Sequence, residues 1–120
     1  MLEPIELGLT GLSVSPLCFG TGTQGWNGRS NQSDLGIDRL ADLLQFAHER
    51  GITFWDTADQ YGTHPHIAEA LRRVDRDQTT ITTKTVSRTA AEVRADMERF
   101  LSELDTDYID IVLLHCMTKA

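Results

Sequence analysis

The chain has 120 residues, of which 40% are hydrophobic and 24% are charged, a balance typical of one folded domain and not of a disordered segment. Its formal net charge of −7 argues against nucleic acid and against anionic membranes as partners. There are two cysteines, no leader-like N-terminus and no apolar run near the roughly 20 residues of a membrane span, so we expect a cytoplasmic protein.

The opening segment predicts a hairpin, a strand and a loop. Residues 5–16 form the predicted β-hairpin, because apolar and polar residues alternate on both sides of the turn pair Thr10-Gly11. The short apolar run at residues 17–19 then predicts a strand that ends in the turn Gly20-Thr21-Gly22. Residues 24–33 are polar and rich in Gly and Asn, which favours a loop.

A helix and a strand are predicted next. Helical periodicity begins near Asp34, and Gly51 suits the left-handed position that closes a helix. Residues 52–55 are too few and too bulky for another helix, so they predict a buried strand. The apolar stripe of the helix is expected to comprise Leu40, Leu43, Leu44 and Ala47.

The rest of the chain predicts two more helices and two more strands. A second helix is expected to start at Pro65, and the β-branched residues 79–83 predict a strand. The capping box Thr89-Ala90-Ala91-Glu92 predicts the start of a third helix, because its side chains can satisfy unpaired backbone donors. Residues 108–114 are the last predicted strand. The expected buried stripes are Ile67, Leu71 and Val74 in the second helix, and Val93, Met97, Phe100, Leu101 and Leu104 in the third.

Strands and helices therefore alternate in units of about 30 residues, which indicates right-handed βαβ units and a parallel sheet. A complete (β/α)₈ barrel takes about 250 residues. The predicted fold class is α/β: the first four strands of a (β/α)₈ TIM barrel, preceded by an N-terminal β-hairpin. Residues 1–120 would form the N-terminal half of one barrel domain, with the hairpin at 5–16 and the βα units at 17–120, and the C-terminal half would be absent.

Four polar residues of different chemistry follow the short apolar strands: Asp56, Tyr61, Lys84 and His115. The carboxyl ends of parallel strands meet at one rim, where α/β folds place their chemistry, so we expect these side chains to gather there. A phenol is a weak acid alone, an ammonium within about 4–6 Å favours the phenolate, and a carboxylate can hold that ammonium. The set suits proton transfer to a carbonyl oxygen whose carbon receives a hydride. None of the four donates hydride, so a nicotinamide cofactor would have to be supplied.

The same residues lie in motifs that resemble those of the aldo-keto reductase family. These motifs are Asp56-Thr57-Ala58-Asp59-Gln60-Tyr61-Gly62, Thr83-Lys84 and Leu113-Leu114-His115, together with Gly8-Leu9-Thr10-Gly11-Leu12-Ser13-Val14-Ser15 and Asp107-Tyr108-Ile109-Asp110. Each string alone is a weak signal, whereas the combination covers essentially the whole chain in the family's order. The resemblance implies a barrel of the aldo-keto reductase type, in which the hairpin closes the barrel floor.

The resemblance also implies a role for each residue. Tyr61 would be the general acid, Lys84 the group that tunes the phenol, and Asp56 the partner of Lys84. His115 would orient the substrate carbonyl. Asp56 and the turn Gly20-Thr21-Gly22 would lie near the nicotinamide ribose of NADP(H), the cofactor of the family.

The substrate implied is a small carbonyl compound, and Trp26 either lines its pocket or covers the rim. In the family, the aromatic residue that stacks on the nicotinamide lies in the second half of the barrel. The pyrophosphate loop and the basic residues for the 2′-phosphate lie there too. The resemblance therefore assigns to this chain the catalytic groups and only part of the cofactor site.

The residues named above could also have roles other than catalysis. Taken alone, Asp56 could cap a turn and His115 could be an ordinary core histidine. His64-Pro65-His66, with Asp59 and Cys116, could bind a metal ion. Metal-dependent hydrolases of this fold carry a His-x-His pair directly on a strand end, whereas this pair lies at a predicted helix start. We therefore expect no metal there, and we expect His64 to cap the helix.

Three functional hypotheses follow. The first is an NADP(H)-dependent oxidoreductase that reduces an aldehyde or ketone to an alcohol. The second is an inactive half barrel or interaction module that self-associates through its open sheet edges. The third is a reductase-like regulatory subunit that senses the cofactor. A stable monomer at high dilution would count against the second, and turnover compared with cofactor release separates the first from the third.

Overall fold

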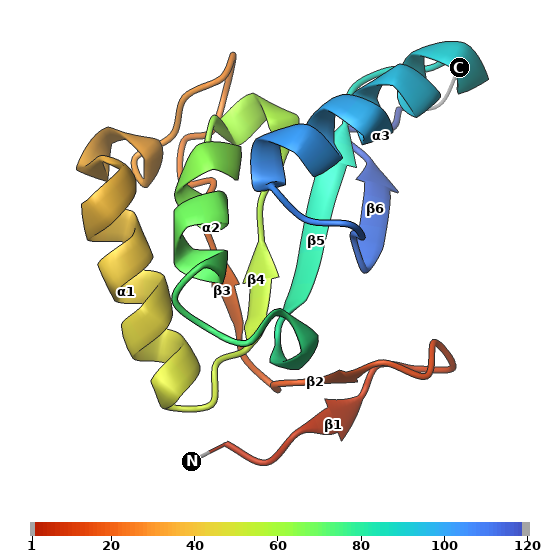
Figure 1. Ribbon diagram of the computed structural model, residues 1–120. Coiled ribbons are helices and arrows are strands. Elements are labelled where there is room, and N and C mark those ends of the chain that lie inside the picture. Colours follow the sequence, from red (N-terminus) through yellow and green to blue (C-terminus); the bar gives the residue numbers. More distant parts are fainter. Residues whose placement is uncertain (1, 119–120) are drawn as a thin grey trace.

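The sheet is parallel, and its strand order follows the chain (Figure 1). A computed structural model describes residues 2–118. Strands β3 (Cys18–Gly20), β4 (Phe54–Asp56), β5 (Thr80–Thr85) and β6 (Ile111–Leu114) pair in that order, each parallel to its neighbour. A helix lies between each strand and the next, as in successive units of a (β/α) barrel. The predicted α/β architecture with four parallel strands is confirmed.

The predicted hairpin is also present. Strands β1 (Ile5–Glu6) and β2 (Ser13–Val14) are antiparallel, and they lie at the end of the sheet where the parallel strands begin (Figure 1). The hydroxyl of Ser15 accepts hydrogen bonds from the Thr53 and Phe54 N–H groups, at 3.1 and 3.2 Å. The hairpin is thereby joined to the start of β4, where these donors would otherwise lack partners.

Three helices cover one face of the sheet: α1 (Ile37–Glu49), α2 (His64–Leu71) and α3 (Ala90–Leu104). Helix α1 begins later than predicted, because residues 33–35 form a separate 3₁₀ turn and Gly36 follows with a φ of 87°. Gly51 has a φ of 90° and closes α1 as predicted. Within residues 2–118, no helix combines the length and the apolar character that crossing a bilayer requires.

The start of α3 follows its capping signal in part. The Thr89 hydroxyl accepts from the Glu92 N–H at 3.3 Å, as in a capping box. The Glu92 carboxylate accepts from the N–H of Arg88 at 3.5 Å, one residue before the expected partner. The first turn of α3 is therefore satisfied by the residues that the sequence indicated, with one bond shifted by a position.

The core lies between the sheet and the helices. Trp55 and Ile81 are paired across β4 and β5, and both are fully buried against the helices. Leu43 is 42% exposed, which contradicts its place in the predicted stripe of α1, because the helix turns Ala41 toward the core instead. The buried residues that pack with this pair are Leu40, Ala41, Leu44, Ile67, Ala70, Leu71 and Leu104.

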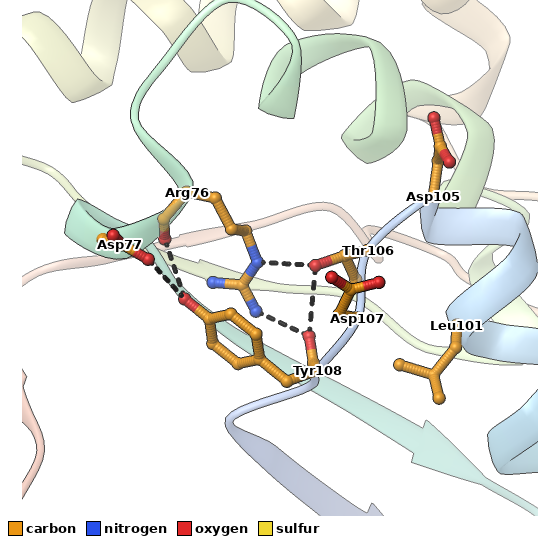
Figure 2. Close-up of a pocket in the computed structure, with 7 residues that line it drawn as sticks. All are labelled: Arg76, Asp77, Leu101, Asp105, Thr106, Asp107 and Tyr108. Carbon is orange, nitrogen blue, oxygen red and sulfur yellow. Dashed lines mark hydrogen bonds between the residues drawn. The ribbon is translucent and has the colours of Figure 1, made fainter.

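An arginine clamp fixes the segment before β6 (Figure 2). The Arg76 guanidinium lies 3.9 Å above the Tyr108 ring and donates to the Tyr108 carbonyl oxygen at 2.8 Å. It also pairs at 3.1 Å with Asp110, whose carboxylate accepts from the Ile81 N–H. A carboxylate thus bonds where a strand carbonyl would, so β6 begins at Ile111 and not at residue 108 as predicted.

Candidate active site

Lys84 is the centre of the candidate site. Its ammonium donates to both carboxylate oxygens of Asp56, at 2.8 and 2.7 Å, and to the Thr57 carbonyl at 3.0 Å. The same ammonium lies 3.3 Å from the Tyr61 hydroxyl oxygen. Asp56 is the last residue of β4 and Lys84 lies inside β5, so the expectation that both follow their strands is wrong. Both strands run one residue or more further than their apolar runs suggested.

Tyr61 projects from a single 3₁₀ turn, η2 (Asp59–Tyr61), between β4 and α2. Two glycines enclose its ring, since a Cβ added to either Gly22 or Gly25 would overlap the ring atoms. The Lys84 ammonium lies 4.7 Å from the ring centroid. Sequence reasoning missed Gly25, and the only signal that could have found it is the Gly-x-x-Gly spacing of residues 22–25.

His115 directly follows β6, and its backbone N–H donates to the Thr85 carbonyl at 2.8 Å. Its imidazole meets the Tyr61 ring edge-on, with 5.6 Å between centroids. Burial, and then the nearby Lys84 ammonium, lower the pKa of His115 below its usual 6.5, so the ring is neutral near pH 7. The structure therefore brings all four polar residues of the sequence prediction to one rim.

The predicted cofactor turn, residues 20–22, contacts the end of β4 at Asp56. Thr21 is fully buried, and its hydroxyl contacts the Asp56 carbonyl and the Thr63 hydroxyl, each at 2.8 Å. The whole of Thr21 therefore faces protein, which leaves Gly20 and Gly22 as the parts of the turn that a ligand can reach. Trp26 is 75% exposed, and its role at the substrate pocket stays a prediction.

The histidine pair lies at the start of α2, as predicted, but the expectation that His64 caps the helix is wrong. Thr63, and not His64, is the residue before the first turn of α2, and the His64 ring instead contacts Glu103 and Thr83, each at 2.8 Å. Donor atoms of Asp59, His64 and Glu103 lie within 4.8 Å of one another. Arg99 pairs with both of these carboxylates, so internal ion pairs satisfy the groups that a metal ion would need.

The arrangement is suited to giving a proton to a bound oxygen. The Tyr61 hydroxyl is a donor, and the neutral His115 ring carries a second one beside it. If the phenol gives up its proton, the phenolate faces the Lys84 ammonium, which the Asp56 carboxylate holds in place. The Tyr61 phenol is therefore placed to act as a general acid whose anion the Lys84–Asp56 pair stabilises.

Comparison with known proteins agrees with this geometry. The model of the aldo/keto reductase family matches residues 16–120. The soybean (Glycine max) protein named Probable aldo-keto reductase 1 is 31% identical over 128 residues, covering 95% of this chain and 36% of its own length. Aldo-keto reductase YhdN of Bacillus subtilis is 27% identical, with 95% of this chain and 38% of that protein covered.

Solved structures agree as well. A thermostable aldo-keto reductase, Tm1743, in complex with the inhibitor epalrestat, matches with a TM-score of 0.80 at 32% identity, covering 96% of this chain and 43% of that one. An aldo-keto reductase of Bombyx mori in complex with NADP matches with a TM-score of 0.75 at 26% identity, covering 94% and 38%. This chain thus spans somewhat over a third of the length of the two curated relatives named above. On the family match, the sequence identities and the shared fold together, the chain belongs to the aldo/keto reductase family.

Proposed function

We propose that this chain carries the catalytic residues of an NADP(H)-dependent reductase that converts an aldehyde or ketone to an alcohol. The observation that carries the proposal is the chain of contacts from Asp56 through Lys84 to the Tyr61 hydroxyl, the last of them 3.3 Å long. His115 lies against the same ring. A lysine with only a structural role in a strand would need neither a tyrosine nor an imidazole beside it.

In the proposed reaction, the substrate oxygen accepts hydrogen bonds from Tyr61 and from His115. The nicotinamide supplies a hydride to the carbonyl carbon when it is bound. The Tyr61 proton passes to the carbonyl oxygen, so the products would be an alcohol, the oxidised nicotinamide cofactor and a Tyr61 phenolate. The phenolate is stabilised by the Lys84 ammonium until solvent returns the proton.

The rim has features that suit such ligands. Asp56 and the backbone of Gly20 and Gly22 would hold the nicotinamide ribose. A relative from Bombyx mori was solved in complex with NADP, which supports the choice of cofactor.

The test uses the intact protein, meaning this chain or any longer natural protein that contains it. Oxidation of NADPH is followed by absorbance with a panel of aromatic aldehydes and ketones, and NADPH binding is followed by its fluorescence. We expect Tyr61→Phe to abolish carbonyl reduction while NADPH still binds. The matched control is Tyr108→Phe, which changes the chain's other tyrosine, in the Arg76 clamp. Undiminished turnover in Tyr61→Phe would show that the general acid is misassigned.

A second role, association through the sheet edge, is favoured by β6. Val112, Leu113 and Leu114 are 37%, 46% and 48% exposed, although they are apolar strand residues. β6 pairs only with β5 within residues 2–118, so its other side presents unpaired backbone groups. We propose that this edge seats further strands, supplied by a longer chain or by a second copy.

A further inference from the structure

Helix α3 has a polar face directed at the catalytic segments. Asp96, Arg99 and Glu103 lie at helical spacings of three and four, which places them on one side of the helix. None of them contacts Tyr61 or Lys84 by a hydrogen bond. Each of them instead contacts a residue close in sequence to Tyr61 or Lys84. Asp96 contacts Thr85, Arg99 contacts Asp59, and Glu103 contacts His64. We call these three residues, with Asp59, His64, Thr83 and Thr85, the α3 polar network.

The first branch of the network holds the turn that carries Tyr61. Arg99 donates to both carboxylate oxygens of Asp59, at 2.9 and 2.7 Å. A two-pronged pair of this kind fixes orientation as well as distance. Asp59 opens η2, the single turn that ends at Tyr61. One turn of 3₁₀ helix has few bonds of its own, so an external ion pair strongly influences where the phenol lies.

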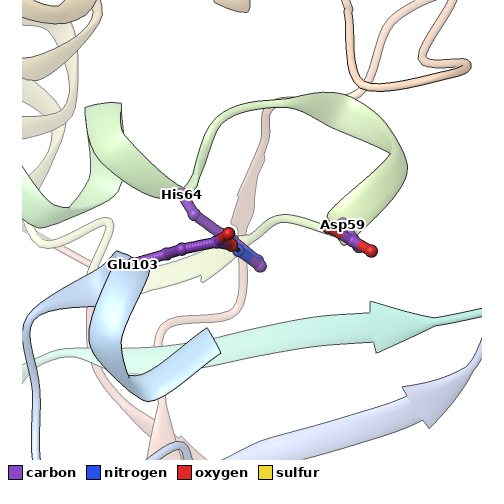
Figure 3. Close-up of side chains that lie close together, drawn as sticks. All are labelled: Asp59, His64 and Glu103. Carbon is purple, nitrogen blue, oxygen red and sulfur yellow. Dashed lines mark hydrogen bonds and ion pairs between the residues drawn. The ribbon is translucent and has the colours of Figure 1, made fainter. Parts of the chain in front are cut away.

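The second branch runs from Glu103 to His64, whose side chains lie close together in Figure 3, and then to Thr83 of β5. The Glu103 carboxylate lies 2.8 Å from His64 Nδ1, and His64 Nε2 lies 2.8 Å from the Thr83 hydroxyl. The ring is only 3% exposed, and this burial lowers the pKa of His64, so it is neutral near pH 7. The neutral ring therefore donates from Nδ1 to Glu103 and accepts at Nε2 from Thr83. Arg99 joins the two branches through a 3.0 Å contact with Glu103.

The third branch reaches the other side of Lys84. The Asp96 carboxylate accepts from the Thr85 hydroxyl and from the Ser87 hydroxyl, each at 2.6 Å. Arg99 lies 3.3 Å from Asp96, so all three branches meet at its guanidinium. Strand side chains alternate between faces, so Thr83 and Thr85 face α3 while Lys84 between them faces the site. The network thus binds β5 at Thr83 and Thr85, the residues on either side of Lys84.

We propose that Arg99, through the α3 polar network, positions the Tyr61 hydroxyl against the Lys84 ammonium for proton transfer. The proposal rests on the proposed reductase function, and it makes Arg99 and Asp59 positioning residues, because neither touches the reacting atoms. A misplacement of about 1 Å can lower a catalytic rate on the order of 100-fold. Breaking the Arg99–Asp59 pair should therefore lower kcat more than it changes KM for NADPH.

The test compares Arg99→Gln and Asp59→Asn with the control Arg94→Gln in the intact protein. Arg94 is exposed on the same helix and forms no ion pair among residues 2–118, so its substitution makes the same change of charge away from the network. We expect kcat to fall about 10- to 100-fold in each network variant, with KM for NADPH within about twofold. The double variant should lose little more than either single one, because the two residues act as a unit. Thermal unfolding of each variant identifies any variant that does not fold. If Arg99→Gln does not fold, Asp59→Asn alone tests the positioning role.

A spectroscopic readout tests the geometry without turnover. The chain has two tyrosines, so ring-labelled tyrosine gives one NMR signal set for Tyr61 and one for Tyr108. Tyr61 lies edge-on to His115, so a displacement of its ring changes its chemical shifts. Arg99→Gln should change the chemical shifts of Tyr61 and leave those of Tyr108 unchanged. Arg94→Gln should change neither set. If the wild type shows no reductase activity, the proposed function fails while this readout still decides the positioning role. Folded network variants with unmoved Tyr61 signals and unchanged kcat would overturn the inference.

Discussion

The enclosure of the Tyr61 ring by glycine leads to a sharp prediction for Gly22→Ala. Gly22 does not have a positive φ, so alanine can adopt its backbone conformation without strain. The added Cβ, however, would overlap three atoms of the Tyr61 ring. The ring is the more mobile of the two groups and must move by roughly 1 Å, which lengthens the 3.3 Å contact with Lys84 beyond a hydrogen bond. We expect kcat to fall about 10- to 100-fold.

The stability of the same variant provides a second measurement. Overpacking of a well-filled site costs about 1–3 kcal/mol, so the free energy of unfolding in urea should decrease. Gly20→Ala is the control for stability, because no atom lies within 4 Å of a Cβ added there. Its unfolding free energy should rise by about 0.4–1 kcal/mol, because alanine restricts the unfolded chain. Gly22→Ala with wild-type kcat and unmoved Tyr61 signals would refute the idea that glycine is needed to seat the ring.

Two further predictions concern stability and association. Burial lowers the pKa values of His48, His64 and His115 below 6.5 in the folded chain. The unfolded chain therefore takes up protons first as the pH falls, so the free energy of unfolding should decrease from about pH 7 to about pH 5, above the range of most carboxylates. A urea midpoint that stays constant or rises over this interval would contradict the sign. The exposed edge of β6 should make the 120-residue chain associate with increasing concentration in sedimentation velocity, and Leu113→Lys should weaken this association. A monomer at all concentrations would show that the edge is not used between copies.

The sequence predicted the architecture well because its signals are local and periodic. Alternating strands and helices, the turn at Thr10-Gly11, the close of α1 at Gly51 and the cap at Thr89 depend on neighbouring residues only. Such patterns specify faces and ends, from which a parallel sheet follows. They do not specify how far a polar residue continues a strand, which is why Lys84 was placed beyond β5 and not inside it.

The parts that were missed depend on contacts between distant segments. His64 resembles a helix cap in the sequence, and its actual partners, Glu103 and Thr83, are 39 and 19 residues away. Likewise, only the folded chain shows that Gly22 and Gly25 enclose Tyr61. The gathering of the four polar residues could be predicted because parallel strands share a rim, whereas the ion pairs that surround them follow from packing of α3.

The alternation of side chains along β5 has a consequence for folding fidelity. A shift of this strand by one residue relative to β4 would turn the ammonium away from Asp56 and toward the acidic side chains of α3, and would put a threonine in its place. Helix and strand content would hardly change in such a species, so circular dichroism would not detect it. On the proposed function, slipped chains would lack the contact between Lys84 and Asp56, so a refolded sample that contains them would combine full ellipticity with low specific activity.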